Sequence, residues 1–82
     1  MYYVYIIYSD SRDRFYVGFT AGDLYWRLQR HNMGWTRSTK NGIPWKLMYH
    51  ESFLTKTEAL KREKFIKRQK SRKFIEKLID TE

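Results

Sequence analysis

The chain has 82 residues, with 17 Lys and Arg against 9 Asp and Glu and a formal net charge of +8. This length fits one small domain over residues 1–82, and the absence of cysteine excludes disulfides and thiolate zinc sites. No apolar run is long enough to cross a bilayer and no signal-peptide pattern opens the chain, so we expect a cytoplasmic protein without membrane contacts.

The first three predicted elements are two strands and a helix. Residues 2–8 (YYVYIIY) and 15–19 (FYVGF) are β-branched and aromatic, and the polar segment SDSRDR (9–14) predicts the turn of a hairpin between them. DLYWRLQRHNM (23–33) has helical spacing, with Asp23 as the N-cap. The residues expected to share one face of this helix are Leu24, Leu28, His31 and Trp35.

A loop and a third strand follow. GWTRSTKNGIP (34–44) reads as a loop and ends in the only proline of the chain. In WKLMYHESF (45–53), apolar and polar residues alternate, which predicts a half-buried strand. We expect one face of this strand to carry Trp45, Leu47, Tyr49 and Phe53, and the other face to carry Lys46, His50 and Ser52.

The last third of the chain predicts two helices. TKTE (55–58) matches a capping box in which Thr55 is the N-cap and Glu58 reaches back, and the helix that it opens ends near Lys70. Ser71 is expected to cap a last helix, whose apolar stripe consists of Phe74, Ile75, Leu78 and Ile79. The order β-β-α-β-α-α indicates an α+β domain, with a small three-stranded antiparallel or mixed sheet flanked by three helices.

The register of the predicted hairpin has a consequence for its tyrosines. If the six-residue turn closes symmetrically, Tyr5 faces Gly18 and Ile7 faces Tyr16. One face of the sheet would then carry Tyr3, Tyr5, Ile7 and Tyr16, and the hydroxyls of Tyr5 and Tyr16 would converge. From periodicity alone, tyrosines that only pack against their neighbours are the favoured explanation.

Glu63 is an acid on an apolar stripe. Helical spacing places it with Ala59, Leu60 and Ile66. A carboxylate in that position is costly unless it is paired or binds a cation. It could hold Mg²⁺ or Mn²⁺ together with waters and phosphates, or it could pair with Arg27, Lys67 or another base. From the residues alone, the ion pair is favoured.

Arg27 and His31 are the other chemically interesting side chains of the first helix. Arg27 lies at the edge of the apolar face, where it could lean over the sheet or extend into water. His31 lies on that face, as a hydrogen-bonded packing residue often does. Since His50 is the only other histidine, we expect no metal cluster of the His or Cys type. The chain has no P-loop, dinucleotide fingerprint or nucleophile-elbow serine.

A basic segment covers residues 61–73 (KREKFIKRQKSRK), which contain eight Lys and Arg and one acid. This density suits a polyanion, most often nucleic acid, although a solvated helix face has the same composition. The candidate nucleic-acid contacts are Lys40, Lys61, Lys64, Lys67, Arg68, Lys70, Arg72 and Lys73.

Several segments together resemble the GIY-YIG nuclease family. VYI (4–6) and YVG (16–18) resemble the two halves of its signature, and DLYWRLQRHN (23–32) resembles its first helix, which carries an essential Arg. GIPWKLMY (42–49) resembles the segment that leads into the third strand, and EALKREKFIK (58–67) resembles the helix with the metal-binding Glu. The resemblance covers essentially the whole chain and is closest to the small stand-alone members.

This resemblance implies a metal-dependent endonuclease that hydrolyses nucleic-acid phosphodiester bonds, with DNA favoured over RNA and one Mg²⁺ or Mn²⁺ ion. Its catalytic residues would be Tyr5, Tyr16, Arg27, His31 and Glu63. The two tyrosines would position and deprotonate the water, with either as the base, and Arg27 would clamp the phosphate. Glu63 rather than Glu58 would hold the ion, and His31 is a candidate for proton transfer.

The chain departs from the family pattern at several positions. Val4 replaces the first glycine, and Phe19 occupies a position where many repair members have a Lys, whose role would be unfilled or taken by His31 or Lys40. An Asn found after the Glu helix in some members has no counterpart. The alternatives are a non-catalytic nucleic-acid-binding module and, third, a protein-interaction domain. For a nuclease we expect little sequence specificity, a preference for branched or flapped structures, and a role in DNA repair or recombination.

Overall fold

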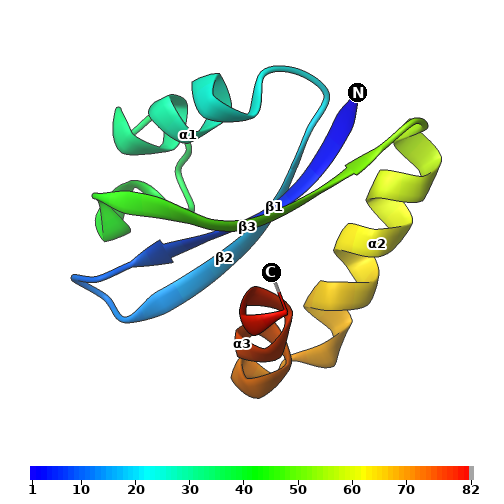
Figure 1. The fold of residues 1–82 in the computed structure, drawn as a ribbon. Coiled ribbons are helices and arrows are strands. Elements are labelled where there is room, and N and C mark those ends of the chain that lie inside the picture. The colour runs from blue at the N-terminus through cyan, green and yellow to red at the C-terminus, as the bar shows by residue number, and fades with distance from the viewer. Residues whose placement is uncertain (82) are drawn as a thin grey trace.

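The computed structural model describes residues 1–81. Its elements are β1 (Tyr2–Ser9), β2 (Arg14–Thr20), α1 (Leu24–Asn32), the short 3₁₀ helix η1 (Lys40–Gly42), β3 (Trp45–Phe53), α2 (Lys56–Gln69) and α3 (Arg72–Asp80). The strands form one antiparallel sheet in the order β2-β1-β3. This confirms the α+β class and the order β-β-α-β-α-α, and it excludes a mixed sheet. α1 lies over one face, and α2 and α3 lie on the other (Figure 1). Within residues 1–81 no helix has the length and hydropathy to span a membrane.

The hairpin has the predicted register. Tyr5 lies opposite Gly18, and Ile7 lies opposite Tyr16. A Cβ atom added at Gly18 would lie 2.4 Å from both Cζ and Oη of Tyr5, so the ring of Tyr5 covers the backbone of β2 at this point. Residue 18 is therefore glycine because the Tyr5 hydroxyl occupies the space where a side chain would begin.

The predicted faces of β3 are wrong because the strand contains a β-bulge. Tyr49 lies opposite Ile6 and Leu47 lies opposite Ile7, so that Met48 is an extra residue without a partner on β1. A bulge reverses the alternation of side chains beyond it. The side chains predicted to share one face are Trp45, Leu47, Tyr49 and Phe53. The first two pack on the α1 side and the last two pack on the α2 and α3 side.

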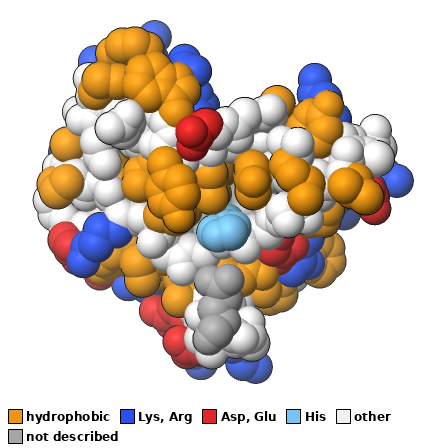
Figure 2. Space-filling view, turned by 45° about the horizontal axis from the view of Figure 1, so that its top comes forward, with side chains coloured by type: hydrophobic (Ala, Val, Ile, Leu, Met, Phe, Trp, Pro, Cys, Tyr) orange, Lys and Arg blue, Asp and Glu red, His pale blue; other side chains and the backbone are white. Residues whose placement is uncertain are grey.

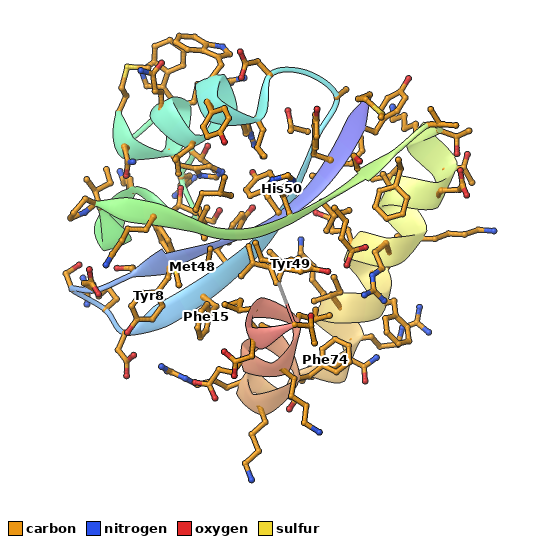
Figure 3. All side chains as sticks on the ribbon, viewed as in Figure 1. Tyr8, Phe15, Met48, Tyr49, His50 and Phe74 are labelled. Atoms are coloured by element: carbon orange, nitrogen blue, oxygen red, sulfur yellow. The ribbon has the colours of Figure 1, made fainter. Side chains whose placement is uncertain are left out.

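In Figure 3, Tyr49 leaves β3 on the side of α2 and α3, and His50 leaves it on the opposite side. His50 lies opposite Tyr5 on β1, and its ring contacts that of Tyr3 with centroids 6.1 Å apart. His50 is exposed whereas His31 is fully buried. In Figure 2 a histidine is visible at the surface among hydrophobic side chains, and Lys and Arg lie mainly around the margin of that face.

Each face of the sheet has its own hydrophobic cluster. On the α2 and α3 side, the buried residues are Val4, Ile6, Val17, Tyr49, Ala59 and Ile66. The predicted stripe of α3, Phe74, Ile75, Leu78 and Ile79, packs against them. On the α1 side, the buried residues are Tyr5, Ile7, Leu24 and Trp45. Trp35 was predicted on the buried face of the first helix, but α1 ends at Asn32 and Trp35 is 60% exposed.

All three predicted N-caps are present. The carboxylate of Asp23 accepts from the backbone N–H groups of Tyr25 and Trp26, and Ser71 Oγ accepts from the backbone N–H of Phe74 at 3.2 Å. At the start of α2, the Thr55 hydroxyl accepts from the backbone N–H of Glu58 at 3.2 Å and lies 2.9 Å from its carboxylate. Glu58 is thus accounted for as part of a cap, which leaves Glu63 as the acid of α2 that needs another explanation.

Candidate active site

A chain of four hydrogen bonds connects α1, β1 and the loop between α1 and β3. Nε of Arg27 donates to the hydroxyl of Tyr5 at 3.3 Å, and that hydroxyl lies 2.7 Å from Nε2 of His31. Nδ1 of His31 lies 2.7 Å from Oγ1 of Thr39, which donates to the backbone carbonyl of Thr36 at 3.3 Å. Tyr5, His31 and Thr39 are buried, with at most 1% of their surface exposed.

The two outer bonds of this chain set the direction of the inner ones, because the guanidinium of Arg27 can only donate and the carbonyl of Thr36 can only accept. A threonine hydroxyl has one proton, and that of Thr39 goes to the carbonyl of Thr36. Oγ1 must then accept from His31, so the imidazole proton is on Nδ1 and Nε2 is an acceptor. The Tyr5 hydroxyl therefore donates to His31 while it accepts from Arg27. Every donor in the chain points toward the loop, and the guanidinium of Arg27 is held at its outer end.

Burial keeps both rings of this chain neutral. It lowers the pKa of His31 to about 4, with the positive charges of Arg27 and Arg30 acting in the same direction. Burial also raises the pKa of the Tyr5 hydroxyl above its ordinary value, and the charge of Glu63 adds to the increase, although Arg27 opposes it. At neutral pH, Tyr5 therefore keeps its proton and His31 carries no charge.

Tyr16 lies on the same sheet face as Tyr5, as the sequence predicts, but it is only half-buried. Its ring meets that of His31 edge-on, with centroids 5.4 Å apart. Nζ of Lys67, on α2, lies 5.7 Å from the centroid of the Tyr16 ring. Of the two tyrosines, Tyr16 is thus the one that a bound molecule can reach.

Glu63 lies beside this group although α2 packs on the opposite face of the sheet. The helix is held there by Ala59 and Ile66, both buried. The Glu63 side chain is 16% exposed, and its carboxylate lies 3.2 Å from Nζ of Lys67. Since Lys67 also lies over Tyr16, the ion pair is next to the edge strand β2. The partner of Glu63 is Lys67, which is one of the partners that the sequence left open.

The surroundings of Glu63 fit one kind of divalent-ion site. Residues 1–81 hold no group of three or more His, Cys, Asp or Glu side chains that could bind a metal by themselves. Mg²⁺, however, commonly keeps several waters and takes one or two carboxylates together with substrate phosphates. A single, partly exposed carboxylate with a movable lysine beside it fits that arrangement. Glu63 is the residue that would hold such an ion, with Lys67 turned aside.

The basic side chains predicted to contact nucleic acid do not form one surface. Lys67 lies at the site described above. A groove on the outer side of α2 is lined mainly by Phe53, Lys61, Arg62, Lys64, Phe65 and Arg68. Arg72 pairs with the carboxylate of Asp13 at 2.7 Å and with that of Glu76 at 3.2 Å. The remaining candidates, Lys40, Lys70 and Lys73, are exposed.

Sequence reasoning missed the residues that hold the loop before β3. The side-chain amide of Asn32 accepts from the backbone N–H of Trp45 at 2.6 Å and donates to its carbonyl at 3.1 Å. Nε1 of Trp45 donates to the backbone carbonyl of Thr39 at 2.6 Å. Thr39 is thus fixed from both sides, by Trp45 and by His31. These contacts cross a loop and have no periodicity, and the only signal for them was the concentration of polar residues in TRSTKN (36–41).

The sequence of the chain is similar to one protein family along most of its length. A family model described as the GIY-YIG catalytic domain matches residues 1–77. The chain belongs to the GIY-YIG family. UPF0213 protein SSP2268 of Staphylococcus saprophyticus is 42% identical over 78 residues, covering 90% of this chain and 93% of that protein. UPF0213 protein SAV0488 of Staphylococcus aureus is 41% identical over the same length. A UPF0213 protein of Streptococcus pneumoniae is 37% identical over 70 residues, or 83% of this chain and 68% of that protein. No solved structure matches the chain.

GIY-YIG membership confirms the resemblance drawn from the two tripeptides and places the chain in a nuclease superfamily. The names of the relatives assign them to UPF0213 and state no activity. The fold explains why one glycine of the signature is retained here and the other is not. Gly18 makes room for the Tyr5 hydroxyl, whereas Val4 is fully buried in the cluster under α2 and α3, where a larger apolar side chain fills space.

Proposed function

We propose that this GIY-YIG protein is a metal-dependent endonuclease that hydrolyses phosphodiester bonds of nucleic acid, with DNA preferred over RNA. Glu63 would hold one Mg²⁺ or Mn²⁺ ion. The observation that carries the proposal is a set of contacts that connects three elements: Arg27 on α1 donates to Tyr5, His31 contacts both Tyr5 and Tyr16 on the sheet, and Lys67 on α2 joins Tyr16 to Glu63. A phenol, a fixed guanidinium and a carboxylate for a cation are the groups that in-line attack of water on phosphorus requires.

Arg27 is proposed to bind the scissile phosphate. Its Nε donates to Tyr5, and the side chain is half-buried, so the two Nη groups are left for a ligand. A forked guanidinium binds two phosphate oxygens at once, which a lysine cannot do. In this proposal Tyr5 and His31 are positioning residues, because they hold Arg27 and are themselves too deeply buried to touch the substrate.

Tyr16 is proposed as the residue that contacts the attacking water and takes its proton. The Tyr5 hydroxyl is buried and engaged by two hydrogen bonds, whereas Tyr16 is half-buried and so is accessible to a bound molecule. A phenol in water loses its proton at about pH 10, so a tyrosine base at neutral pH needs cations beside it. The divalent ion proposed at Glu63 would be one such cation.

In the proposed reaction, the water forms a bond to phosphorus while the bond from phosphorus to the 3′ oxygen breaks, which leaves a 5′ phosphate. A divalent ion bound at Glu63 would stabilise the negative charge on the phosphoryl oxygen and on the departing 3′ oxygen. Arg27 would hold the phosphate in line for attack. Contacts made to phosphate carry no sequence information, so we expect little sequence specificity and a preference set by the shape of the substrate, such as branched or flapped DNA.

The experiment is a cleavage assay with a panel of nucleic acids. Supercoiled plasmid, flapped and branched DNA duplexes, single strands and RNA are incubated with the protein in Mg²⁺, in Mn²⁺ and in EDTA. The proposal predicts nicking of DNA in either metal and none in EDTA. Salt-sensitive binding without cleavage of any substrate would instead support a non-catalytic nucleic-acid-binding module. If the protein binds no nucleic acid at moderate salt, the result would contradict both the endonuclease and the binding module and would favour a protein-interaction domain.

A further inference from the structure

A second basic site adjoins Tyr16 and is not explained by the reaction centre. A pocket of about 210 Å³ lies between the turn of the β1–β2 hairpin and the loop before β3. Its polar lining comes from Arg12, Arg14, Tyr16, Ser38 and Asn41. No acidic side chain lines it, so the pocket carries two positive charges and several hydrogen-bond donors without a counter-charge inside it.

The acids nearest in sequence to the two arginines are already paired. The carboxylate of Asp10 lies 3.0 Å from Nζ of Lys46, and that of Asp13 lies 2.7 Å from Arg72. Neither carboxylate lines the pocket. Two uncompensated guanidinium groups around a small concave space are the arrangement that proteins use for phosphate and other small oxyanions.

The pocket is also held in shape by its own contacts. Nε of Arg12 donates to the backbone carbonyl of Asn41 at 3.1 Å, which ties the hairpin turn to η1. Gly42 forms part of the wall, and a Cβ atom there would lie 2.5 Å from Cζ2 of Trp45 and 3.1 Å from Oγ of Ser9. Trp45 itself is fixed by Asn32, so the wall rests on residues that the fold already holds.

We propose that this pocket binds a phosphate group of the nucleic-acid strand that flanks the scissile phosphate. The proposal rests on the proposed nuclease function, because Tyr16 both lines the pocket and contacts the attacking water in that reaction. A strand whose scissile phosphate lies at Arg27 would pass Tyr16 and present its next phosphates to Arg12 and Arg14. This contact reads no bases, and it sets the path of the strand across the site.

Binding in EDTA tests the proposal separately from cleavage. Affinity for a single-stranded oligonucleotide is measured by fluorescence anisotropy between 50 and 200 mM salt for the wild type and the double variant Arg12→Ala/Arg14→Ala. Loss of one phosphate contact is expected to weaken binding about tenfold at low salt. It is also expected to make the slope of log K against log salt shallower by about 0.7. The control is Lys56→Ala/Lys77→Ala, which removes two exposed charges from α2 and α3 and is expected to change the slope less.

A second measurement uses the wild-type protein alone. Arginine side-chain Nε–H resonances are followed by NMR during titration with inorganic phosphate and, separately, with a dinucleotide that carries a 5′ phosphate. Shifts of Arg12 and Arg14 that saturate with the dinucleotide at lower concentration than with phosphate support a strand contact. Saturation at equal concentrations, or equal salt slopes for the two double variants, would overturn the proposal.

Wild-type protein that binds through this pocket but cleaves nothing would leave the pocket assigned and refute the nuclease function. Cleavage by the wild type, together with a salt slope that Arg12→Ala/Arg14→Ala leaves unchanged, would support the nuclease function and overturn the assignment of the pocket.

Discussion

The hydroxyl of Tyr5 lies 2.7 Å from Nε2 of His31 and accepts a hydrogen bond from Nε of Arg27, so one buried oxygen connects the imidazole to the guanidinium. Because His31 is in turn held by Thr39, the position of Arg27 depends on a loop residue on the far side of the ring. The charged guanidinium of Arg27 is thus held near the surface by the neutral, buried side chains of Tyr5 and His31. Such support holds a functional group in place without a competing charge.

Thr39 is the residue on which the tautomer of His31 depends. Thr39→Val keeps the shape but leaves Nδ1–H of His31 without an acceptor, which is expected to lower the free energy of unfolding by about 1–3 kcal/mol. The loss is measured by urea denaturation, and ¹⁵N shifts of the imidazole report the tautomer. Thr39→Ser keeps the hydroxyl and is expected to keep the Nδ1–H form. If Thr39→Val shows the wild-type tautomer and stability, the assigned hydrogen-bond direction is wrong.

Gly18 is predicted to be intolerant of any side chain. Gly18→Ala places a methyl group 2.4 Å from the Tyr5 ring and hydroxyl, which cannot move without breaking the bonds to His31 and Arg27. Overpacking of this kind is expected to cost about 1–3 kcal/mol of stability and to reduce cleavage. Gly22→Ala is the matched control, because nothing lies within 4 Å of the added atom. Equal stability of the two variants in thermal unfolding would contradict this packing.

Stability is predicted to fall in mild acid because of His31. Its folded pKa of about 4 is below the ordinary value of 6.5, so the unfolded chain binds this proton first as the pH falls. The free energy of unfolding should therefore decrease between about pH 6.5 and 4, by on the order of 2–3 kcal/mol. Urea denaturation at a series of pH values measures this decrease. His31→Gln should reduce the slope, and His50→Gln, at an exposed position, should not. A slope that is unchanged in His31→Gln would rule out this residue as its source.

The two tyrosines are predicted to differ in what their hydroxyls do. Tyr16→Phe is expected to lower the cleavage rate about 10²–10⁴-fold, as loss of a general base does, with stability within about 0.5 kcal/mol of the wild type. Tyr5→Phe leaves Nε2 of buried His31 without a donor and is expected to cost about 1–3 kcal/mol as well as activity. Cleavage rates and urea denaturation of both variants decide the assignment. Full activity of Tyr16→Phe would show that another group takes the proton.

Local patterns in the sequence predicted most of the elements and half of the site. The hairpin register follows from the alternation of residues on either side of a short turn, which is why Tyr5 and Tyr16 could be placed on one face. The caps at Asp23, Thr55 and Ser71 follow from polar side chains at helix starts. Glu63 stood out because an acid on an apolar helix stripe is costly.

The features that the sequence did not predict depend on contacts between distant segments. The bulge at Met48 has no signature in an alternating strand, yet it moves Tyr49 and Phe53 to the other face of the sheet. Thr39 acquires its role only because the loop carries it against His31 on α1. The position of Glu63 near Tyr16 likewise depends on how α2 packs against β2, which no periodicity specifies.

The most direct test of the account compares the two acids of α2 in a single-turnover cleavage assay with Mg²⁺. Glu63→Gln and Glu58→Gln each remove one negative charge from the same helix, and circular dichroism confirms that each variant is folded. Glutamine can still complete the cap in place of Glu58, so that variant is expected to cleave DNA at nearly the wild-type rate. Glu63→Gln removes the proposed ion ligand and is expected to be slower by about 10²–10³-fold. Equal rates for the two variants, or no cleavage by the wild type on any substrate of the panel, would contradict the proposed role of Glu63 and with it the proposed nuclease mechanism.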